Sequence, residues 1–268
     1  MTPSLRICSL LLLVAVTTGC VKFKQLWTVQ PDGSGKMTMT MGVSLMMLSK
    51  ADGDPFDDLN DPAKMIEQEK NGWVAFSQPE VFTENGFKFA VVTGYFDDIN
   101  QVTFSGSGQN ADNPDMSPTA YQLQDNTLTV TNPMLGQVVK GMRDDPTMRD
   151  PAMKEMMAPM IEGLEMTETY QLSGPVQSAE GYQTQQSSAT RTLTAADLLR
   201  EQPPTIEGLE DDKLVIEFEA GQWIGSEDAW KSELNDAKAK WAELKQNANG
   251  GASSAHESEI EGRSDAGE

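Results

Sequence analysis

The sequence predicts an α+β fold that is mostly antiparallel sheet, with a few packing helices, a C-terminal amphipathic helix and a disordered acidic tail. Three observations predict this fold. Apolar and polar residues alternate in short segments separated by turn dipeptides, which is typical of antiparallel strands. Asp-Pro pairs open two segments with helical character, and apolar residues recur every three or four positions near the C-terminus. The 268 residues can bury a substantial core.

The first half is predicted to be sheet. Residues 21–30 and 36–44 are expected to form two strands, because apolar and polar side chains alternate on both sides of the turn sequence Pro31-Asp32-Gly33-Ser34-Gly35. Asn85-Gly86 is a strong signal for a second hairpin, between residues 73–82 and 87–96. Short strands are also expected over residues 101–105, 121–124 and 127–131, and a helix is expected from Asp61-Pro62 to Lys70.

The second half mixes helices and strands. Helices are predicted over residues 133–142 and 150–164, and Pro159 is expected to kink or end the second one. Thr194-Ala195-Ala196-Asp197 resembles a capping box for a short helix. Strands are expected over residues 168–172 and 213–219, while residues 183–192 are ambiguous, with strand as one interpretation.

A last helix is predicted from Ser226 to about Gln246, because Trp230, Leu234, Ala237, Trp241 and Leu244 recur at spacings of four and three. Such a stripe either packs the helix onto the sheet or, if the helix is detached, forms a partner-binding surface centred on Trp230 and Trp241. Residues 247–268 have the Gly, Ser and Glu composition of a disordered tail.

Composition excludes several classes of protein. The formal net charge is −21, from 20 basic and 41 acidic residues, so nucleic acid and anionic lipid headgroups would be repelled. The only cysteines are Cys8 and Cys20 and the only histidine is His256, in the polar tail. The body therefore lacks the residues for a zinc site of His and Cys, and for Ser-His or Cys-His nucleophile pairs.

The N-terminus has the pattern of an export signal. Arg6 precedes a mostly apolar run over residues 7–16, which is the length of a signal-peptide core and far short of the roughly 20 apolar residues that span a bilayer. Val16-Thr17-Thr18-Gly19-Cys20 resembles the lipobox of bacterial lipoprotein precursors. We expect cleavage before Cys20 and lipid on its thiol; an ordinary cleaved leader and an uncleaved anchor are the alternatives.

Methionines form two patterns. Met37, Met39 and Met41 alternate along a predicted strand. Thioether sulfur is a ligand for Cu(I), so a copper site is one interpretation. Side chains two apart on a strand line one face, however, and methionine fills irregular cores well, so we expect core packing for both groups. The second group lies at helical spacing and comprises Met153, Met156, Met157 and Met160.

Acidic residues also invite a functional interpretation. Residues 52–61 hold five aspartates, but Phe56, Asp57 and Ala63 break the EF-hand pattern, so a solvated acidic loop is expected in place of a calcium site. Paired carboxylates could serve glycoside hydrolysis, yet pairing among 41 acidic residues is not readable from sequence. We expect no catalytic residues, no metal and no cofactor.

Several short stretches are together similar to the LppM-like domain of bacterial envelope lipoproteins. They would cover about residues 20 to 220. The resemblance implies an α+β envelope domain and carries over no catalytic residue. The stretches are Lys24-Gln25-Leu26-Trp27-Thr28-Val29 and Asp32-Gly33-Ser34-Gly35 after the lipobox cysteine, Gly72-Trp73, Asn85-Gly86, Val91-Val92-Thr93-Gly94-Tyr95-Phe96 and Leu172-Ser173-Gly174-Pro175-Val176.

The leading hypothesis is a non-catalytic lipoprotein, anchored through Cys20 to the outer or cytoplasmic membrane and facing the periplasm or exterior, which binds another envelope protein or lipid. A lipoprotein that binds a small ligand or copper through its methionine-rich helices is the alternative, and an unrecognised hydrolase is the third. The predicted parts are a signal peptide at 1–19, the α+β domain at 20–220, the amphipathic helix at 221–246 and the tail at 247–268.

Overall fold

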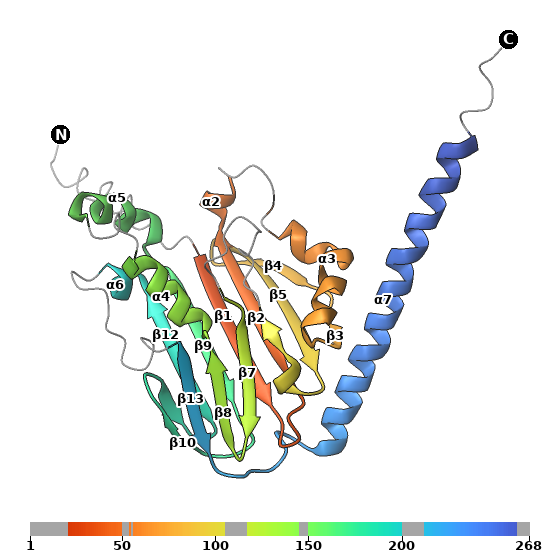
Figure 1. Ribbon diagram of the computed structural model, residues 1–268. Coiled ribbons are helices and arrows are strands. Elements are labelled where there is room, and N and C mark those ends of the chain that lie inside the picture. Colours follow the sequence, from red (N-terminus) through yellow and green to blue (C-terminus); the bar gives the residue numbers. More distant parts are fainter. Residues whose placement is uncertain are drawn as a thin grey trace, which may run out of the picture.

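The computed structural model describes residues 21–49, 54, 56–104, 117–144, 150–199 and 212–261, with side chains to residue 248 in the last segment. It confirms an α+β fold with mostly antiparallel sheet (Figure 1). The predicted signal peptide, Cys20 and the end of the predicted tail lie outside the described residues.

The larger sheet, sheet A, has eight strands in the order β11-β12-β9-β1-β2-β5-β3, with β4 also paired to β5. All of its pairs are antiparallel except β1 with β9, which are parallel. Its strands are β1 (Val21–Val29), β2 (Gly35–Ser44), β3 (Ala75–Phe76), β4 (Glu80–Glu84), β5 (Phe87–Phe96), β9 (Glu165–Gln171), β11 (Gln183–Gln185) and β12 (Ser188–Thr194).

The smaller sheet, sheet B, has five strands in the order β10-β13-β8-β7-β6, and every pair in it is antiparallel. It lies in front of the larger sheet in Figure 1. Its strands are β6 (Thr103–Phe104), β7 (Thr119–Gln124), β8 (Thr127–Thr131), β10 (Val176–Ala179) and β13 (Lys213–Phe218).

The core lies between the two sheets, because each turns its apolar face inward. Trp27 of β1 is fully buried, and its ring centroid lies 4.3 Å from that of Tyr121 on sheet B. The opposite face of sheet A is polar and carries a threonine ladder in which the hydroxyl groups of Thr169 and Thr190 lie 3.1 Å apart. This division is what a strand period of two produces when one face is buried.

The helices are short apart from the last one. Within the described residues they are α2 (Leu45–Leu48), α3 (Pro62–Glu67), α4 (Met134–Asp144), α5 (Pro151–Ile161), α6 (Ala195–Leu198) and α7 (Glu227–Glu261), with single 3-10 turns η1 (Asp57–Asn60), η2 (Gln68–Asn71) and η3 (Ile99–Gln101). The backbone of α7 stays helical to Glu261, beyond the predicted end near Gln246, and the helix runs along the β3 edge of sheet A (Figure 1).

Local signals placed most elements correctly. Asn85-Gly86 forms the β4–β5 turn with positive φ at both residues, as the Asn-Gly signal predicts. The prediction of a single strand over residues 73–82 was wrong, because β3 and β4 are separate strands. The break between them contains Pro79, which has no N–H group to donate a hydrogen bond to a neighbouring strand. The ambiguous segment 183–192 forms the β11–β12 hairpin.

Candidate functional site

The described chain begins directly in a strand. Val21 is the first residue of β1 and pairs with Val43 near the end of β2. Val21 directly follows Cys20 in the sequence. Within the described residues, none of the helices is long and apolar enough to cross a membrane.

Trp230 and Trp241 do not form an exposed partner surface, which corrects that interpretation of the helical stripe. They are 4% and 2% exposed, because α7 packs onto the body. The indole N–H of Trp230 donates to Ser34 Oγ at 2.8 Å, and that of Trp241 donates to Glu69 Oε1 at 2.7 Å. Removing two indole rings from water favours packing over a detached helix.

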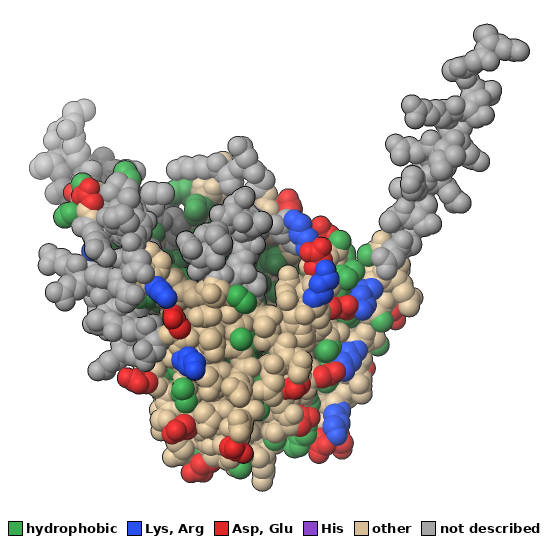
Figure 2. Space-filling view, in the orientation of Figure 1, with side chains coloured by type: hydrophobic (Ala, Val, Ile, Leu, Met, Phe, Trp, Pro, Cys, Tyr) green, Lys and Arg blue, Asp and Glu red, His purple; other side chains and the backbone are tan. Residues whose placement is uncertain are grey.

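Ion pairs fix α7 along the same edge. Lys245 Nζ lies 2.6 Å from Glu69 Oε1, and Lys238 Nζ lies 2.7 Å from Asp97 Oδ1. Burial of Glu69 opposes its ionisation, but hydrogen bonds from Lys245 and Trp241 outweigh this effect and hold the pKa of Glu69 below its ordinary value. Figure 2 shows basic and acidic side chains gathered along this side of the molecule. These contacts hold α7 in a defined position beside the sheet.

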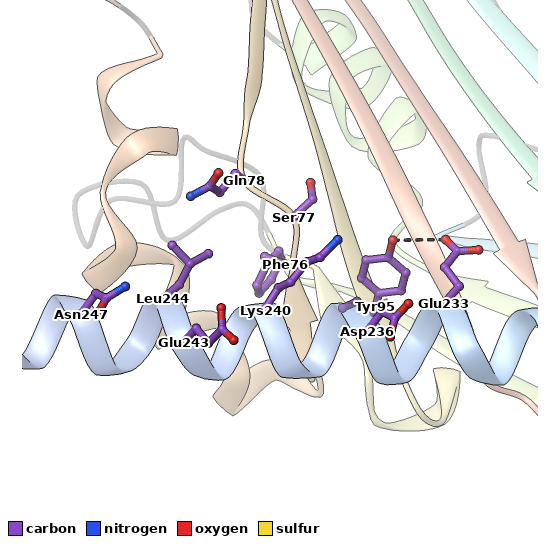
Figure 3. A pocket seen from close by; sticks show the side chains of 11 residues that line it. Phe76, Ser77, Gln78, Tyr95, Glu233, Asp236, Lys240, Glu243, Leu244 and Asn247 are labelled. Atoms are coloured by element: carbon purple, nitrogen blue, oxygen red, sulfur yellow. Dashed lines mark hydrogen bonds between the residues drawn. The ribbon is translucent and has the colours of Figure 1, made fainter.

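A groove of about 700 Å³ lies between α7 and the β3 end of sheet A (Figure 3). Its sheet side is formed by Phe76 and the two residues after it, together with Tyr95 of β5. Its helix side carries three acidic residues and one basic residue, together with two apolar side chains and one amide. The helix residues are Glu233, Asp236, Ala237, Lys240, Glu243, Leu244 and Asn247.

One end of the groove is held by a charged network. Tyr95 Oη donates to Glu233 Oε1 at 3.1 Å, and Lys36 Nζ donates to the same oxygen at 2.5 Å (Figure 3 shows the first bond). Burial, followed by the charge and hydrogen bond of Glu233, raises the pKa of Tyr95 to about 12. Tyr95 thus stays neutral at physiological pH. The groove thus combines aromatic rings on its sheet side with carboxylates on its helix side.

The methionine predictions have a mixed outcome. Met37 is 3% exposed in the core and Met39 packs against that core, so the prediction of core packing is confirmed for these two residues, whereas Met41 is half-buried and is not among the residues of that core cluster. For the helical group the prediction was wrong at Met156, whose side chain is 56% exposed. The side chains of the other three lie outside the described residues. The described His, Cys, Asp and Glu residues form no group able to hold a metal ion.

In the acidic loop, the described carboxylates have structural contacts. Asp54 forms an ion pair with Lys88, and Asp61 caps α3 by accepting from the N–H of Ala63 at 2.9 Å. The side-chain hydrogen bond from Lys88 is the main cause that lowers the pKa of Asp54. Both carboxylates thus tie the loop to its neighbours.

A buried carboxylate in the core was missed from the sequence. Glu168 on β9 is fully buried and accepts hydrogen bonds from Tyr170 Oη at 2.8 Å and Tyr182 Oη at 2.6 Å. Burial raises the pKa of Glu168, and the two hydroxyl donors oppose that rise. The sequence signal that could have predicted this buried carboxylate was an acidic residue at an inward-facing position of a strand. The alternation of inward and outward residues along the strand does not reveal which tyrosines donate to it.

Gln25 lies beside Glu168 on the neighbouring strand, where β1 and β9 pair. Gln25 is 2% exposed, and within the described part of the chain neither its amide oxygen nor its amide nitrogen has a hydrogen-bond partner. The indole nitrogen of Trp27 is also buried and has no hydrogen-bond partner among the described residues. Buried polar groups of this kind commonly bind internal water, so this row of the core is polar within an otherwise apolar layer.

The raised pKa of Glu168 predicts a pH effect on stability. An acid whose pKa is higher in the folded than in the unfolded protein favours folding while it is protonated, and this contribution is lost as pH rises from about 4.5 through the folded pKa. We expect Glu168→Gln to gain stability relative to wild type as pH rises through that window, measured by urea unfolding at a series of pH values. Glu217→Gln on the exposed face of sheet B is the control, and parallel curves for wild type and Glu168→Gln would contradict the prediction.

Comparison with known proteins gives one structural similarity. The sequence matches no protein family and no curated protein. The fold is similar to the folded domain of the Mycobacterium tuberculosis LppM protein, with a TM-score of 0.37 and 13% sequence identity over 75% of this chain and 92% of that domain.

Proposed function

We propose that this chain is a lipid-anchored lipoprotein of the bacterial cell envelope that has no catalytic activity and binds another envelope protein. The observation that carries the proposal is the start of β1 at Val21, one residue after the cysteine of the lipobox. A lipid at that position is joined directly to a rigid strand, so the body is presented at the membrane surface without a flexible linker.

The groove beside α7 is the proposed binding site. Its floor contains the rings of Phe76 and Tyr95, and its helix wall contributes Asp236 and Glu243, with Lys240 between them in sequence. Aromatic groups supply apolar contact area, and carboxylates at the rim select a basic partner and speed its approach. A basic segment of another protein therefore fits the groove better than an acidic or purely apolar one.

Charge reversal in the groove tests this site. In cells that produce the full-length protein, a photocrosslinking amino acid at Gln78 is expected to capture a defined neighbour. Asp236→Lys combined with Glu243→Lys should lower the crosslink yield by about tenfold, because two attractive contacts become repulsive.

The matched control is Glu217→Lys with Glu219→Lys, which makes the same change in net charge on sheet B. Both residues are exposed; Glu217 lies near the end of β13 and Glu219 directly follows that strand. An equal loss of yield in both double variants, or an unchanged yield in the groove variant, would rule out the groove as the site.

A further inference from the structure

The apolar residues of α2 are exposed, although a short helix of this kind usually packs them inward. Leu45, Met46 and Met47 are 43%, 52% and 44% exposed, and α2 carries no acidic residue in its first turn and no basic residue in its last. Single exposed apolar residues are ordinary on protein surfaces, but three in succession form a patch that normally has a partner.

This patch is fixed in position. Ser44 caps α2 by accepting from the N–H of Met47, and the N–H of Leu45 donates to the carbonyl oxygen of Gly86 at 2.9 Å. The helix is thereby joined to the β4–β5 turn as well as to β2. On β4, Val81 and Phe82 are also exposed, at 40% and 38%; as successive strand residues they point to opposite faces of the sheet.

The patch lies beside the N-terminal end of β1. Val21 pairs with Val43, and α2 starts two residues beyond Val43. Paired strands lie about 5 Å apart, so the N-terminal end of β1, which directly follows Cys20 and its sulfur in the sequence, lies beside the start of α2. Acyl chains on that sulfur would enter the bilayer at once, and α2 would then be at the membrane surface.

A third element has the same character. Met156 of α5 is 56% exposed, and α2 and α5 lie at the same end of the molecule in Figure 1. Hydrophobic side chains are visible at this end in Figure 2. The turn between β11 and β12 lies at the opposite end of sheet A. Ser188, which follows this turn, pairs with Gln171, and Gln171 pairs with Thr28 of β1. Thr28 is seven residues along β1 from Val21, and this length of strand spans about 23 Å.

We infer that Leu45, Met46 and Met47, with Met156, form a second membrane contact, which inserts into the interface of the bilayer beside the acyl chains on Cys20. The inference rests on the proposed lipid anchor. A bilayer is the fitting partner because the patch is apolar and uncharged while the whole chain carries a net charge of −21, so attraction to lipid headgroups cannot hold the body against the membrane. With two points of contact the body would have a defined orientation.

The test measures the depth of two labels. Lipidated full-length protein carrying Met46→Cys or Gln185→Cys, each labelled with an environment-sensitive fluorophore, is placed in phosphatidylethanolamine–phosphatidylglycerol vesicles that contain a nitroxide lipid. Cys20 does not react with the label when its sulfur is alkylated. Quenching of the label at position 46 is expected to exceed that at position 185 by roughly threefold or more.

The outcomes separate the two proposals. Equal, weak quenching at both positions, in protein that carries acyl groups by mass spectrometry and floats with the vesicles, would overturn the second contact and leave the anchor in place. Protein that has no acyl mass and does not float would overturn the proposed anchor, and the second contact with it. Labelled protein with Met47→Asp supports the inference if quenching at position 46 falls to the level at position 185.

Discussion

Substitution of Cys20 by Ala is expected to release the protein from the membrane fraction almost completely, so that about a tenth or less remains bound. The expectation follows from the proposed lipid anchor at Cys20, where the sequence resembles a lipobox, and from the anchoring strength of acyl chains, which contribute about 0.8 kcal/mol per buried methylene group. The exposed patch on α2 is too small to replace several acyl chains. Fractionation, with intact mass of the extracted protein, checks the result.

Cys8→Ala is the matched control, because this residue lies within the predicted signal peptide and should leave with it. Its product should have the same mass and membrane association as wild type. A Cys20→Ala protein that stays in the membrane fraction with an uncleaved N-terminus would instead favour the uncleaved anchor. A wild-type product without acyl groups would favour an ordinary cleaved leader.

Substitution of Trp230 by Ala is expected to destabilise the packing of α7 by about 3–5 kcal/mol. Trp230 is 4% exposed, its ring centroid lies 6.3 Å from that of Tyr95, and its N–H bonds to Ser34. Loss of the ring leaves a cavity at the start of the helix and removes the hydrogen bond to Ser34 Oγ, which keeps its own bond to Asp32 Oδ1. Hydrogen exchange of the α7 amides, measured by mass spectrometry, should become much faster than exchange in β1 and β2.

Trp223 provides the control for this variant. It lies before α7, is partly exposed, and its ring has Lys231 Nζ 5.9 Å from the centroid. Trp223→Ala should therefore cost about 1 kcal/mol or less and leave exchange in α7 nearly unchanged. Unchanged exchange in the Trp230→Ala protein would contradict the account of α7 as a helix held by its tryptophans.

The loss of packing in the Trp230→Ala variant should also disrupt the groove beside α7. Tyr95 and Glu233 both line the groove. The ring of Tyr95 lies beside that of Trp230, and Glu233, which accepts a hydrogen bond from Tyr95, is on the following turn of α7. If α7 detaches, the two sides of the groove separate. Trp230→Ala is therefore expected to reduce crosslinking from Gln78 together with the protection of α7, whereas the charge-reversal variant should reduce crosslinking alone.

Local sequence patterns predicted the hairpins and the amphipathic helix because their causes are local. Asn85-Gly86 and Asp125-Asn126 tolerate the positive φ values that a two-residue turn needs. Alternation along β1 and β2 placed Trp27 and Met37 on one face, where they pair. The spacing of Trp230 and Trp241 showed that they share a helix face, but that spacing suits a packed helix and an exposed one equally.

Other features depended on residues far apart in the sequence. The parallel pairing of β1 with β9 joins Gln25 to Glu168, and no local signal chooses that partner among the available strands. The ionisation of Glu168 depends on burial and on the hydroxyl groups of Tyr170 and Tyr182, which the sheet brings to it. The groove beside α7 exists only because the helix packs at a sheet edge formed some 150 residues earlier.

The sequence by itself determined the strand phase, the turns, the helix with its apolar stripe, and the export pattern that ends at Cys20, since each depends on neighbouring residues alone. The tertiary structure decided which apolar residues are covered. It buried Trp230 and Trp241 and left Met46 and Met156 exposed. The physical reason is that burial depends on the surface offered by distant segments, so the same apolar side chain becomes core or contact surface according to what packs against it.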